Sequence, residues 1–379
     1  MPDSYRYLRK PQRISHGNDV CLLVDGAQGY PAMVKAIFDA RDTVNLETYI
    51  FASDETGWNF ARALAGAAER GVEVNVLLDG YGSVGCATSL LQYLAGAGVR
   101  VSWFKPLVPW RSGWGWWRRD HRKILVVDGG VGFVGGLNIA DDYADEASGG
   151  RGWRDTHVRI VGPAVADLQQ SFLRIWRKTR GPRLDRAIHL PELVARGGSD
   201  AAILTNRIHK ERRQIRKAYL HALTRSRQYI YLTSAYFIPG YRIRSRLRKA
   251  CARGVDVRIL LAGASDIGLV TRAARHLYTR LLKRGVRIYE WAGPMMHAKT
   301  AVVDGEWATV GSCNLDVLSM RYNLECNAVV LGDTLAGPLT AQFRLDLERS
   351  HEIQLAEWRQ RSWAQKFLDS LAYRLRSWL

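Results

Sequence analysis

The chain has 379 residues, of which 47% are hydrophobic and 24% are charged, a composition typical of a folded protein that excludes extensive disorder. Its 55 lysines and arginines outnumber 36 acidic residues and give a net charge of +19, which predicts either affinity for polyanions or simply high solubility. Thirteen tryptophans favour a membrane surface over nucleic acid as the polyanion, because indole rings prefer the membrane–water interface.

Cysteine content and hydropathy limit the cellular context. The five cysteines are scattered and odd in number, and no pair has zinc-ligand spacing, so we expect a reducing compartment with no disulfide framework. The first residues lack the apolar core of a signal peptide, and no run of about 18 apolar residues occurs. We therefore expect no signal peptide, no transmembrane helix and only peripheral membrane contact.

The predicted elements occur twice along the chain. Each half begins with an amphipathic helix, a strand and a second helix, and continues with a Val- and Leu-rich strand, a third helix and a short strand. The first three elements fall at residues 30–40, 43–51 and 58–70, and again at residues 215–223, 229–237 and 243–253. This alternation predicts an α/β fold of two similar lobes, a pseudo-dimer with mixed sheets flanked by helices.

A boundary between the lobes is expected near residues 181–200, which contain two prolines and a Gly-Gly-Ser sequence. We therefore predict an amino-terminal lobe at residues 1–190, a carboxy-terminal lobe at residues 191–350 and an amphipathic helical tail at residues 351–379.

One chemical motif also occurs twice, once in each half. It consists of a histidine, a lysine two residues later and an aspartate five residues after that. A glycine-rich return ending in asparagine follows both copies at the same distance. The residues are His121, Lys123, Asp128, Gly135, Gly136 and Asn138 in the first copy, and His297, Lys299, Asp304, Gly311, Ser312 and Asn314 in the second.

The spacing has a direct chemical interpretation. Histidine and lysine two residues apart on a strand point to the same face, so an imidazole and an ammonium group share one pocket. The ammonium group can bind the oxygens of a phosphate, and the imidazole can attack phosphorus or carry a proton. A single copy is typical of a solvated strand edge, whereas two copies with matching returns predict phosphodiester chemistry.

With these motifs, the chain resembles the phospholipase D superfamily, and within it the bacterial cardiolipin synthases. The resemblance extends over roughly residues 18–345 and includes the run Trp153-Arg-Asp-Thr-His157 and the alternating residues from Ser319 to Asn327. Without amino-terminal membrane helices, the chain is most similar to the shorter, B-type enzymes. Gly136 departs from the pattern, because many relatives carry serine there.

The resemblance implies one site formed where the lobes meet. His121 would be the nucleophile that forms a phosphohistidine, and His297 the general acid and base, although the two-fold likeness makes the reverse order conceivable. The groups expected to bind the substrate phosphate are Lys123, Lys299, Asn138, Asn314, Gly136 and Ser312. We expect no cofactor and no metal, because two lysines already supply the positive charge.

Two different roles are expected for four carboxylates of the two halves. Asp128 and Asp304 lie at an odd separation from their histidines, so we expect them to face away from the site and to stabilise the fold. Asp155 and Glu325 follow the two glycine-rich returns, and we expect each to orient the histidine of its own half. An ordinary surface ion pair is the alternative for both.

Two segments are candidates for membrane contact. Trp110, Trp114, Trp116 and Trp117 alternate with arginines just before His121, which is typical of an interfacial loop, the alternative being a Trp-rich turn in the core. In the tail, Trp363, Phe367 and Trp378 share one face of a predicted amphipathic helix, which would lie on a membrane or pack on the core.

The resemblance implies transfer of a phosphatidyl group from phosphatidylglycerol to a second phospholipid, either phosphatidylglycerol or phosphatidylethanolamine. The alternatives are hydrolysis to phosphatidic acid and, less favoured, nuclease activity, so nucleic acid is not the expected partner. The expected location is the cytoplasmic face of the bacterial inner membrane, where the protein would bind an anionic lipid surface peripherally.

Overall fold

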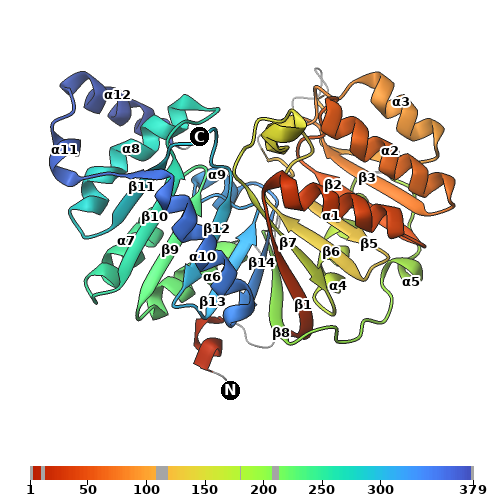
Figure 1. The fold of residues 1–379 in the computed structure, drawn as a ribbon, viewed down its shortest axis with the longest axis horizontal. Coiled ribbons are helices and arrows are strands. Elements are labelled where there is room, and N and C mark those ends of the chain that lie inside the picture. Colours follow the sequence, from red (N-terminus) through yellow and green to blue (C-terminus); the bar gives the residue numbers. More distant parts are fainter. Residues whose placement is uncertain (1–2, 10–12, 108–117, 180, 207–212, 377–379) are drawn as a thin grey trace.

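A computed structural model describes residues 3–9, 13–107, 118–179, 181–206 and 213–376. Its strands form one mixed, fifteen-stranded sheet that runs through both lobes in the order β15-β11-β10-β9-β12-β13-β14-β8-β1-β7-β6-β5-β2-β3-β4 (Figure 1). The predicted α/β fold of two similar lobes is confirmed, and the two half-sheets join into one where β1 pairs with β8.

The first lobe contains the strands and helices predicted from its apolar periodicity, with a short 3-10 helix, η1, ahead of them. The elements are η1 (Asp3–Tyr7), β1 (Ser15–Val24), α1 (Asp25–Asp39), β2 (Thr43–Thr48), α2 (Glu55–Glu69), β3 (Glu73–Asp79), α3 (Thr88–Gly96), β4 (Arg100–Phe104), β5 (Ile124–Val127), β6 (Val131–Gly135), η3 (Asp141–Tyr143), η4 (Glu146–Ser148), β7 (Thr156–Val161), α4 (Val165–Trp176) and α5 (Arg186–His189).

The second lobe repeats this series and adds a carboxy-terminal extension. Its elements are β8 (Ser199–Asn206), α6 (Gln214–Arg225), β9 (Tyr229–Ser234), α7 (Tyr241–Cys251), β10 (Asp256–Ala262), α8 (Gly268–Leu282), β11 (Arg287–Trp291), β12 (Lys299–Val303), β13 (Trp307–Gly311), α9 (Val317–Arg321), β14 (Glu325–Leu331), α10 (Asp333–Glu348), β15 (Ser350–Glu352), α11 (Leu355–Arg359) and α12 (Trp363–Arg374).

The two halves are related by an approximate two-fold axis at the β1–β8 join. Moving outward from β1, the order β7, β6, β5, β2, β3, β4 matches the order β14, β13, β12, β9, β10, β11 outward from β8. In each half the three outer strands are parallel and are connected by helices, whereas the inner strands are antiparallel. Figure 1 shows α1 and α2 in front of the first half-sheet and α10 in front of the second.

Apolar side chains from both lobes pack together at the join. This cluster includes Ile124 and Val126 of β5, Val302 of β12, Leu168 of α4 and Leu339 of α10, all at most 2% exposed. Burial of such side chains is worth about 1.5–3 kcal/mol each, so the cluster holds the lobes in one fixed relation.

The start of the chain packs on the second lobe. Tyr7 is fully buried in the core of the second lobe, and its hydroxyl donates a 2.5 Å hydrogen bond to Asp304. The range 1–190 therefore needs a correction at its beginning, because these first residues lie in the other lobe. Periodicity carries no signal for this contact, since it joins residues about 300 positions apart in sequence.

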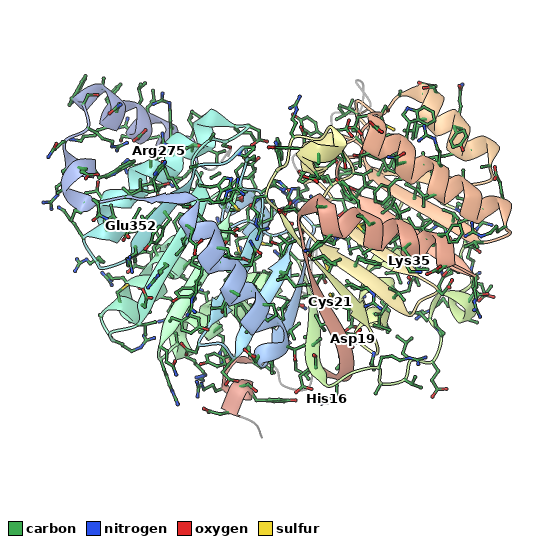
Figure 2. All side chains as sticks on the ribbon, viewed as in Figure 1. His16, Asp19, Cys21, Lys35, Arg275 and Glu352 are labelled. Atoms are coloured by element: carbon green, nitrogen blue, oxygen red, sulfur yellow. The ribbon has the colours of Figure 1, made fainter. Side chains whose placement is uncertain are left out.

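The carboxy-terminal extension begins on the sheet. β15 pairs with β11 and forms the edge of the sheet, and Glu352 accepts two hydrogen bonds of 2.8 Å from Arg287. Figure 2 shows Glu352 and Arg275 in the outer part of the second lobe, away from the join. Beyond β15, α12 packs against α8. In the described part of the chain, no helix is long and apolar enough to cross a membrane.

Candidate active site

The two histidines enter the site on segments that immediately precede β5 and β12. The backbone N–H of His121 donates to the carbonyl of Leu324 at 3.0 Å, and that of His297 donates to the carbonyl of Arg154 at 2.7 Å. Leu324 precedes β14 of the second lobe and Arg154 precedes β7 of the first. Each motif is therefore hydrogen-bonded to the opposite lobe, and the two segments meet at the pseudo-two-fold axis.

The carboxylates that contact the histidines also cross between the lobes. His121 Nδ1 lies 3.1 Å from Glu325 Oε2, and His297 Nδ1 lies 2.6 Å from Asp155 Oδ2. The prediction that each carboxylate serves the histidine of its own half is wrong. The segments before β7 and β14 run beside the motif of the other lobe, so the carboxylate that is nearer in sequence is farther in space.

This pairing leaves the opposite ring nitrogen of each histidine free for chemistry. A carboxylate bound at Nδ1 holds the proton there, so that Nε2 presents its lone pair. Both imidazoles are largely buried, with 11% of the His121 side chain and 6% of the His297 side chain exposed.

The two lysines lie deep within the same cluster. Lys123 Nζ donates to the carbonyl of His121 at 2.7 Å, and Lys299 Nζ makes the equivalent bond to the carbonyl of His297. Burial lowers the pKa of Lys123 to about 7 and that of Lys299 to about 8, although Glu325 and Asp155 oppose this shift in both. The charge of Lys299 also lowers the pKa of Lys123, so the two ammonium groups lie near one another.

The same electrostatics govern the histidine–carboxylate pairs. Burial, reinforced by the neighbouring lysines, lowers the pKa of His121 and lowers that of His297 to about 4. Although its own burial acts in the opposite direction, Asp155 is held at a pKa of about 2 by the charges of His297 and Lys299. Asp155 is therefore ionised throughout the physiological range, and a bound phosphate would add the negative charge that favours imidazolium.

The glycine-rich returns place a different residue behind each carboxylate. Ser312 donates its hydroxyl to Glu325 Oε2. At the equivalent position, a Cβ on Gly136 would lie 2.0 Å from Asp155 Oδ1. A serine does not fit beside Asp155 in this geometry, which gives a physical reason for the departure at Gly136.

The two asparagines are anchored within the protein. Asn138 accepts from the N–H of Ile50 at 3.1 Å and donates to the hydroxyl of Tyr143 at 2.6 Å. Asn314 accepts from the N–H of Tyr236 at 3.3 Å. Among the described residues, the amide nitrogen of Asn314 has no acceptor, so it can bind a phosphate oxygen more readily than that of Asn138.

The two motif aspartates lie in turns away from the histidines. Asp128 accepts hydrogen bonds from the N–H groups of Arg41, Asp42 and Thr43 just before β2, and Asp304 does the same for residues 227–229 before β9. Both aspartates have positive φ values, 50° and 55°. The alternation of side chains along a strand therefore does not apply to these two aspartates. Their hydrogen bonds stabilise the turns in which they lie.

Sequence reasoning missed an arginine that supports Asp155. Arg154 is buried and pairs with Asp346 of α10 at 2.9 Å and with Asp25 of α1 at 3.1 Å. Asp25 also accepts from the N–H of Asp155 at 2.8 Å. The only available signal was the position of Arg154 directly before Asp155, which does not reveal partners so distant in sequence.

Aromatic rings flank both imidazoles. Tyr49 lies edge-on to His121 with centroids 5.0 Å apart, and Tyr143 lies edge-on to His297 at 5.2 Å. His157 is buried under the first return, where its Nδ1 accepts from the N–H of Leu137 at 3.2 Å, so it supports that return. In the described part of the chain, no group of histidine, cysteine and acidic side chains is arranged to hold a metal ion.

The candidates for membrane contact fall partly outside the described residues, namely Trp110, Trp114, Trp116, Trp117 and Trp378. Within α12, Trp363 is 77% exposed and Phe367 is 53% exposed. The opposite face of α12 is buried through Ala372 and Asp369, which pairs with Arg361 at 2.9 Å. α12 therefore packs on the second lobe through this face, whereas its apolar face points outward.

Solved structures with this architecture define the class of fold. Phosphatidylserine synthase from Haemophilus influenzae Rd KW20 superposes with a TM-score of 0.72 at 12% identity, covering 97% of this chain and 94% of that one. A polyphosphate kinase from Porphyromonas gingivalis gives a TM-score of 0.61 at 14% identity, covering 89% of this chain and 49% of that one. Similarity at this level of identity establishes the fold alone.

Sequence comparisons identify the family. The family model described as "Cardiolipin synthase, PLD-like domain" matches residues 33–176 and 219–347. Cardiolipin synthase B of Escherichia coli K12 is 37% identical over 356 residues, which are 92% of this chain and 85% of that protein. Cardiolipin synthase of Halalkalibacterium halodurans is 34% identical over 360 residues, covering 94% and 71%. The chain belongs to the cardiolipin synthase family of phospholipase D-like proteins.

Proposed function

We propose that the protein is a cardiolipin synthase that transfers a phosphatidyl group from phosphatidylglycerol to a second phospholipid through a phosphohistidine. The acceptor would be phosphatidylglycerol, whose head group carries a free hydroxyl. Phosphatidylethanolamine carries an amine there, so it cannot be the acceptor expected from the sequence; as the partner lipid it would be the donor, with ethanolamine as the leaving group. The observation that carries the proposal is the crossed arrangement of His121–Glu325 and His297–Asp155 around two buried lysines. Two oriented imidazoles and two ammonium groups are the parts that a two-step phosphoryl substitution requires.

In the first step, His121 Nε2 would attack the phosphorus of phosphatidylglycerol. A P–N bond forms and the P–O bond to the glycerol head group breaks, while protonated His297 gives its proton to the departing oxygen. Lys123 and Lys299 would neutralise the non-bridging oxygens, with Asn314 adding an N–H donor. Glycerol then leaves the site.

In the second step, the acceptor hydroxyl would replace glycerol. His297 Nε2 removes its proton, the hydroxyl oxygen attacks phosphorus and the P–N bond breaks, which restores neutral His121. Water in place of the acceptor would give phosphatidic acid, so hydrolysis is the competing outcome of the same site.

Differences between the two pairs support this division of roles. Asp155 is ionised and lies 2.6 Å from His297. Its negative charge stabilises the imidazolium form in which His297 acts as a general acid. Glu325 divides its Oε2 between His121, at 3.1 Å, and the hydroxyl of Ser312. The looser contact of Glu325 suits a nucleophile that is neutral when it attacks. Burial lowers the pKa of His297 to about 4, so His297 gains its proton only when the negative charge of the bound donor phosphate is present.

We also propose peripheral binding to the anionic, cytoplasmic face of the bacterial inner membrane. The support is the outward apolar face of α12, on which Trp363, Phe367 and Leu371 are 47–77% exposed, together with the net charge of +19. Replacing these three residues with glutamine should lower flotation with phosphatidylglycerol vesicles by at least about fivefold. Substitution of Ala356 and Glu357 of α11 is the control and should leave flotation unchanged. If substitution of the three α12 residues also leaves flotation unchanged, the membrane role of α12 is contradicted.

Product analysis tests the reaction itself. Incubation with phosphatidylglycerol vesicles should give cardiolipin and glycerol in equal amounts, and release of ethanolamine from added phosphatidylethanolamine tests the alternative donor. Phosphatidic acid as the sole product would make the protein a hydrolase instead. Cleavage of single-stranded DNA without lipid turnover would make it a nuclease. His121→Ala serves as the inactive control.

A further inference from the structure

A second cavity, rich in arginine, lies in the second lobe beside the histidine site. It has a volume of about 420 Å³ and is formed by the beginnings of α6 and α7 together with α9. Four arginines line it, Arg213, Arg216, Arg242 and Arg321. Within the described part of the chain, none of these four side chains forms an ion pair with a carboxylate, although Asp316 also lines the cavity.

The four guanidinium groups are close enough to repel one another. Partial burial and then the charges of Arg213, Arg242 and Arg321 lower the pKa of Arg216. Arg213 Nε is buried and has no hydrogen-bond partner among the described residues. Like charges gathered without counter-charges cost free energy, and a bound anion would remove that cost.

The floor and rim of the cavity indicate what kind of anion fits. Ile243, Leu315 and Met320 line it with apolar side chains that are 2–5% exposed. Tyr241, at its rim, is 71% exposed. A cavity with guanidinium walls and an apolar floor suits a phosphate that carries a glycerol or acyl group better than a bare inorganic ion.

One short segment of the chain links the wall of the cavity to the proposed site. Leu315 and Asp316 directly follow Asn314, and Leu315 bridges to Phe237 next to Tyr236, which donates to Asn314. Burial lowers the pKa of Lys299, and the negative charge of Asp316 opposes this shift. The charge of Asp316 therefore acts on the histidine site.

We propose that this arginine cavity binds the phosphate of the acceptor phospholipid while the donor phosphate occupies the two-lysine site. This inference rests on the proposed function, in which two anionic lipids must be held at once. The apolar floor favours a lipid over a nucleic acid, because the phosphates of a nucleic acid carry no apolar group that would contact this floor.

Calorimetry tests the cavity without turnover. Full-length His121→Ala protein is titrated with dihexanoyl phosphatidylglycerol below its micellar concentration, and we expect two sites per chain. Arg242→Gln/Arg321→Gln, two exposed positions outside any ion pair among the described residues, should leave one site. Arg248→Gln/Arg280→Gln removes the same charge from exposed positions lining a neighbouring basic groove of the α7–α8 surface and should retain both sites.

Competing ligands distinguish the possible sources of phosphate. We expect glycerol 3-phosphate to compete for the cavity at least about tenfold more weakly than the lipid, because it lacks the acyl groups. Equal affinity would mean a soluble phosphate ligand and would overturn the lipid assignment. If single-stranded DNA competes more strongly than the lipid, and this competition is lost in the Arg242→Gln/Arg321→Gln variant, the lipid assignment is overturned as well.

Activity provides the second readout. In the otherwise native chain, Arg242→Gln/Arg321→Gln should lower the ratio of cardiolipin to phosphatidic acid by at least about tenfold, as loss of charge-assisted bonds to the acceptor requires. A parallel fall of both products, or no change, would overturn the proposal. If the native protein makes no cardiolipin, the proposed function fails, and the number of lipid sites still decides whether the cavity binds a phospholipid.

Discussion

Asp155 and Glu325 each reach across the lobe boundary to a histidine that their own lobe does not supply. Asp155→Asn should reduce turnover by about 10²–10⁴-fold, because the imidazolium of His297 loses its counter-charge, and Glu325→Gln should act in the same way through His121. Circular dichroism should show an intact fold in both variants.

Imidazole nuclear magnetic resonance can verify the crossed pairing directly. Asp155→Asn should shift the titration of His297 more than that of His121, and Glu325→Gln should do the reverse. If each substitution perturbs the histidine of its own lobe instead, the crossed geometry is incorrect.

The buried lysines predict an alkaline limit to activity. Since the pKa values of Lys123 and Lys299 are lowered to about 7 and 8, both lose their proton as the pH rises through this range. Because both charges are needed, the value of kcat/KM should fall as Lys123 loses its proton, above about pH 7. Lys123→Arg should move this limb upward by about one pH unit, because guanidinium stays charged and Lys299, with a pKa of about 8, then sets the limb.

Lys35→Arg is the matched control for that profile. Lys35 lies on α1, is labelled in Figure 2 and forms an exposed pair with Asp39 at 2.6 Å. Its substitution should leave the alkaline limb in place. An unshifted limb in Lys123→Arg would show that the lysines do not set it.

At the scale of elements, the return after β6 and the segment before β7 are fitted to each other. Gly136→Ser should lower activity by about 10²-fold or more, because the new Cβ would displace the Asp155 carboxylate. The second half-site combines serine with the longer glutamate. Gly136→Ser/Asp155→Glu should thus recover at least about tenfold over Gly136→Ser, and an additive further loss would contradict the argument.

Arg154 links α1, α10 and the segment before β7 in one buried network. Arg154→Met leaves Asp346 without its partner, so the free energy of unfolding should fall by about 3–5 kcal/mol in urea denaturation. Arg159→Met breaks an exposed pair with Asp19, which Figure 2 labels on β1, and should cost at most about 1 kcal/mol. Equal losses in both variants would contradict the structural role of Arg154.

At the scale of the whole molecule, sequence reasoning predicted what is local and repeated. The helices and strands follow apolar periodicity, and the doubled His-x-Lys motif led to the residues that now surround one space. Those features are encoded within a few residues of each other, so a single sequence suffices to find them.

The relations that sequence reasoning missed join segments that are far apart in the chain. Asp155 contacts His297, and Arg154 contacts Asp346, across the join between the lobes. Tyr7 contacts Asp304 because the start of the chain packs on the second lobe. Spacing cannot predict such contacts, because only the folded chain brings these segments together. The turn that holds Asp128 was missed for a different reason, since its left-handed φ ends the strand alternation on which the prediction relied.

The central claim is that one site uses His121 as nucleophile and His297 as acid and base. A phosphatidyl ester of p-nitrophenol needs no proton on its leaving group, so His297→Asn should release one equivalent of p-nitrophenolate in a burst and then stall. Mass spectrometry of the quenched protein should locate the phosphatidyl group on the peptide that contains His121. No burst and no adduct, or an adduct at His297 in the His121→Asn variant, would contradict this account.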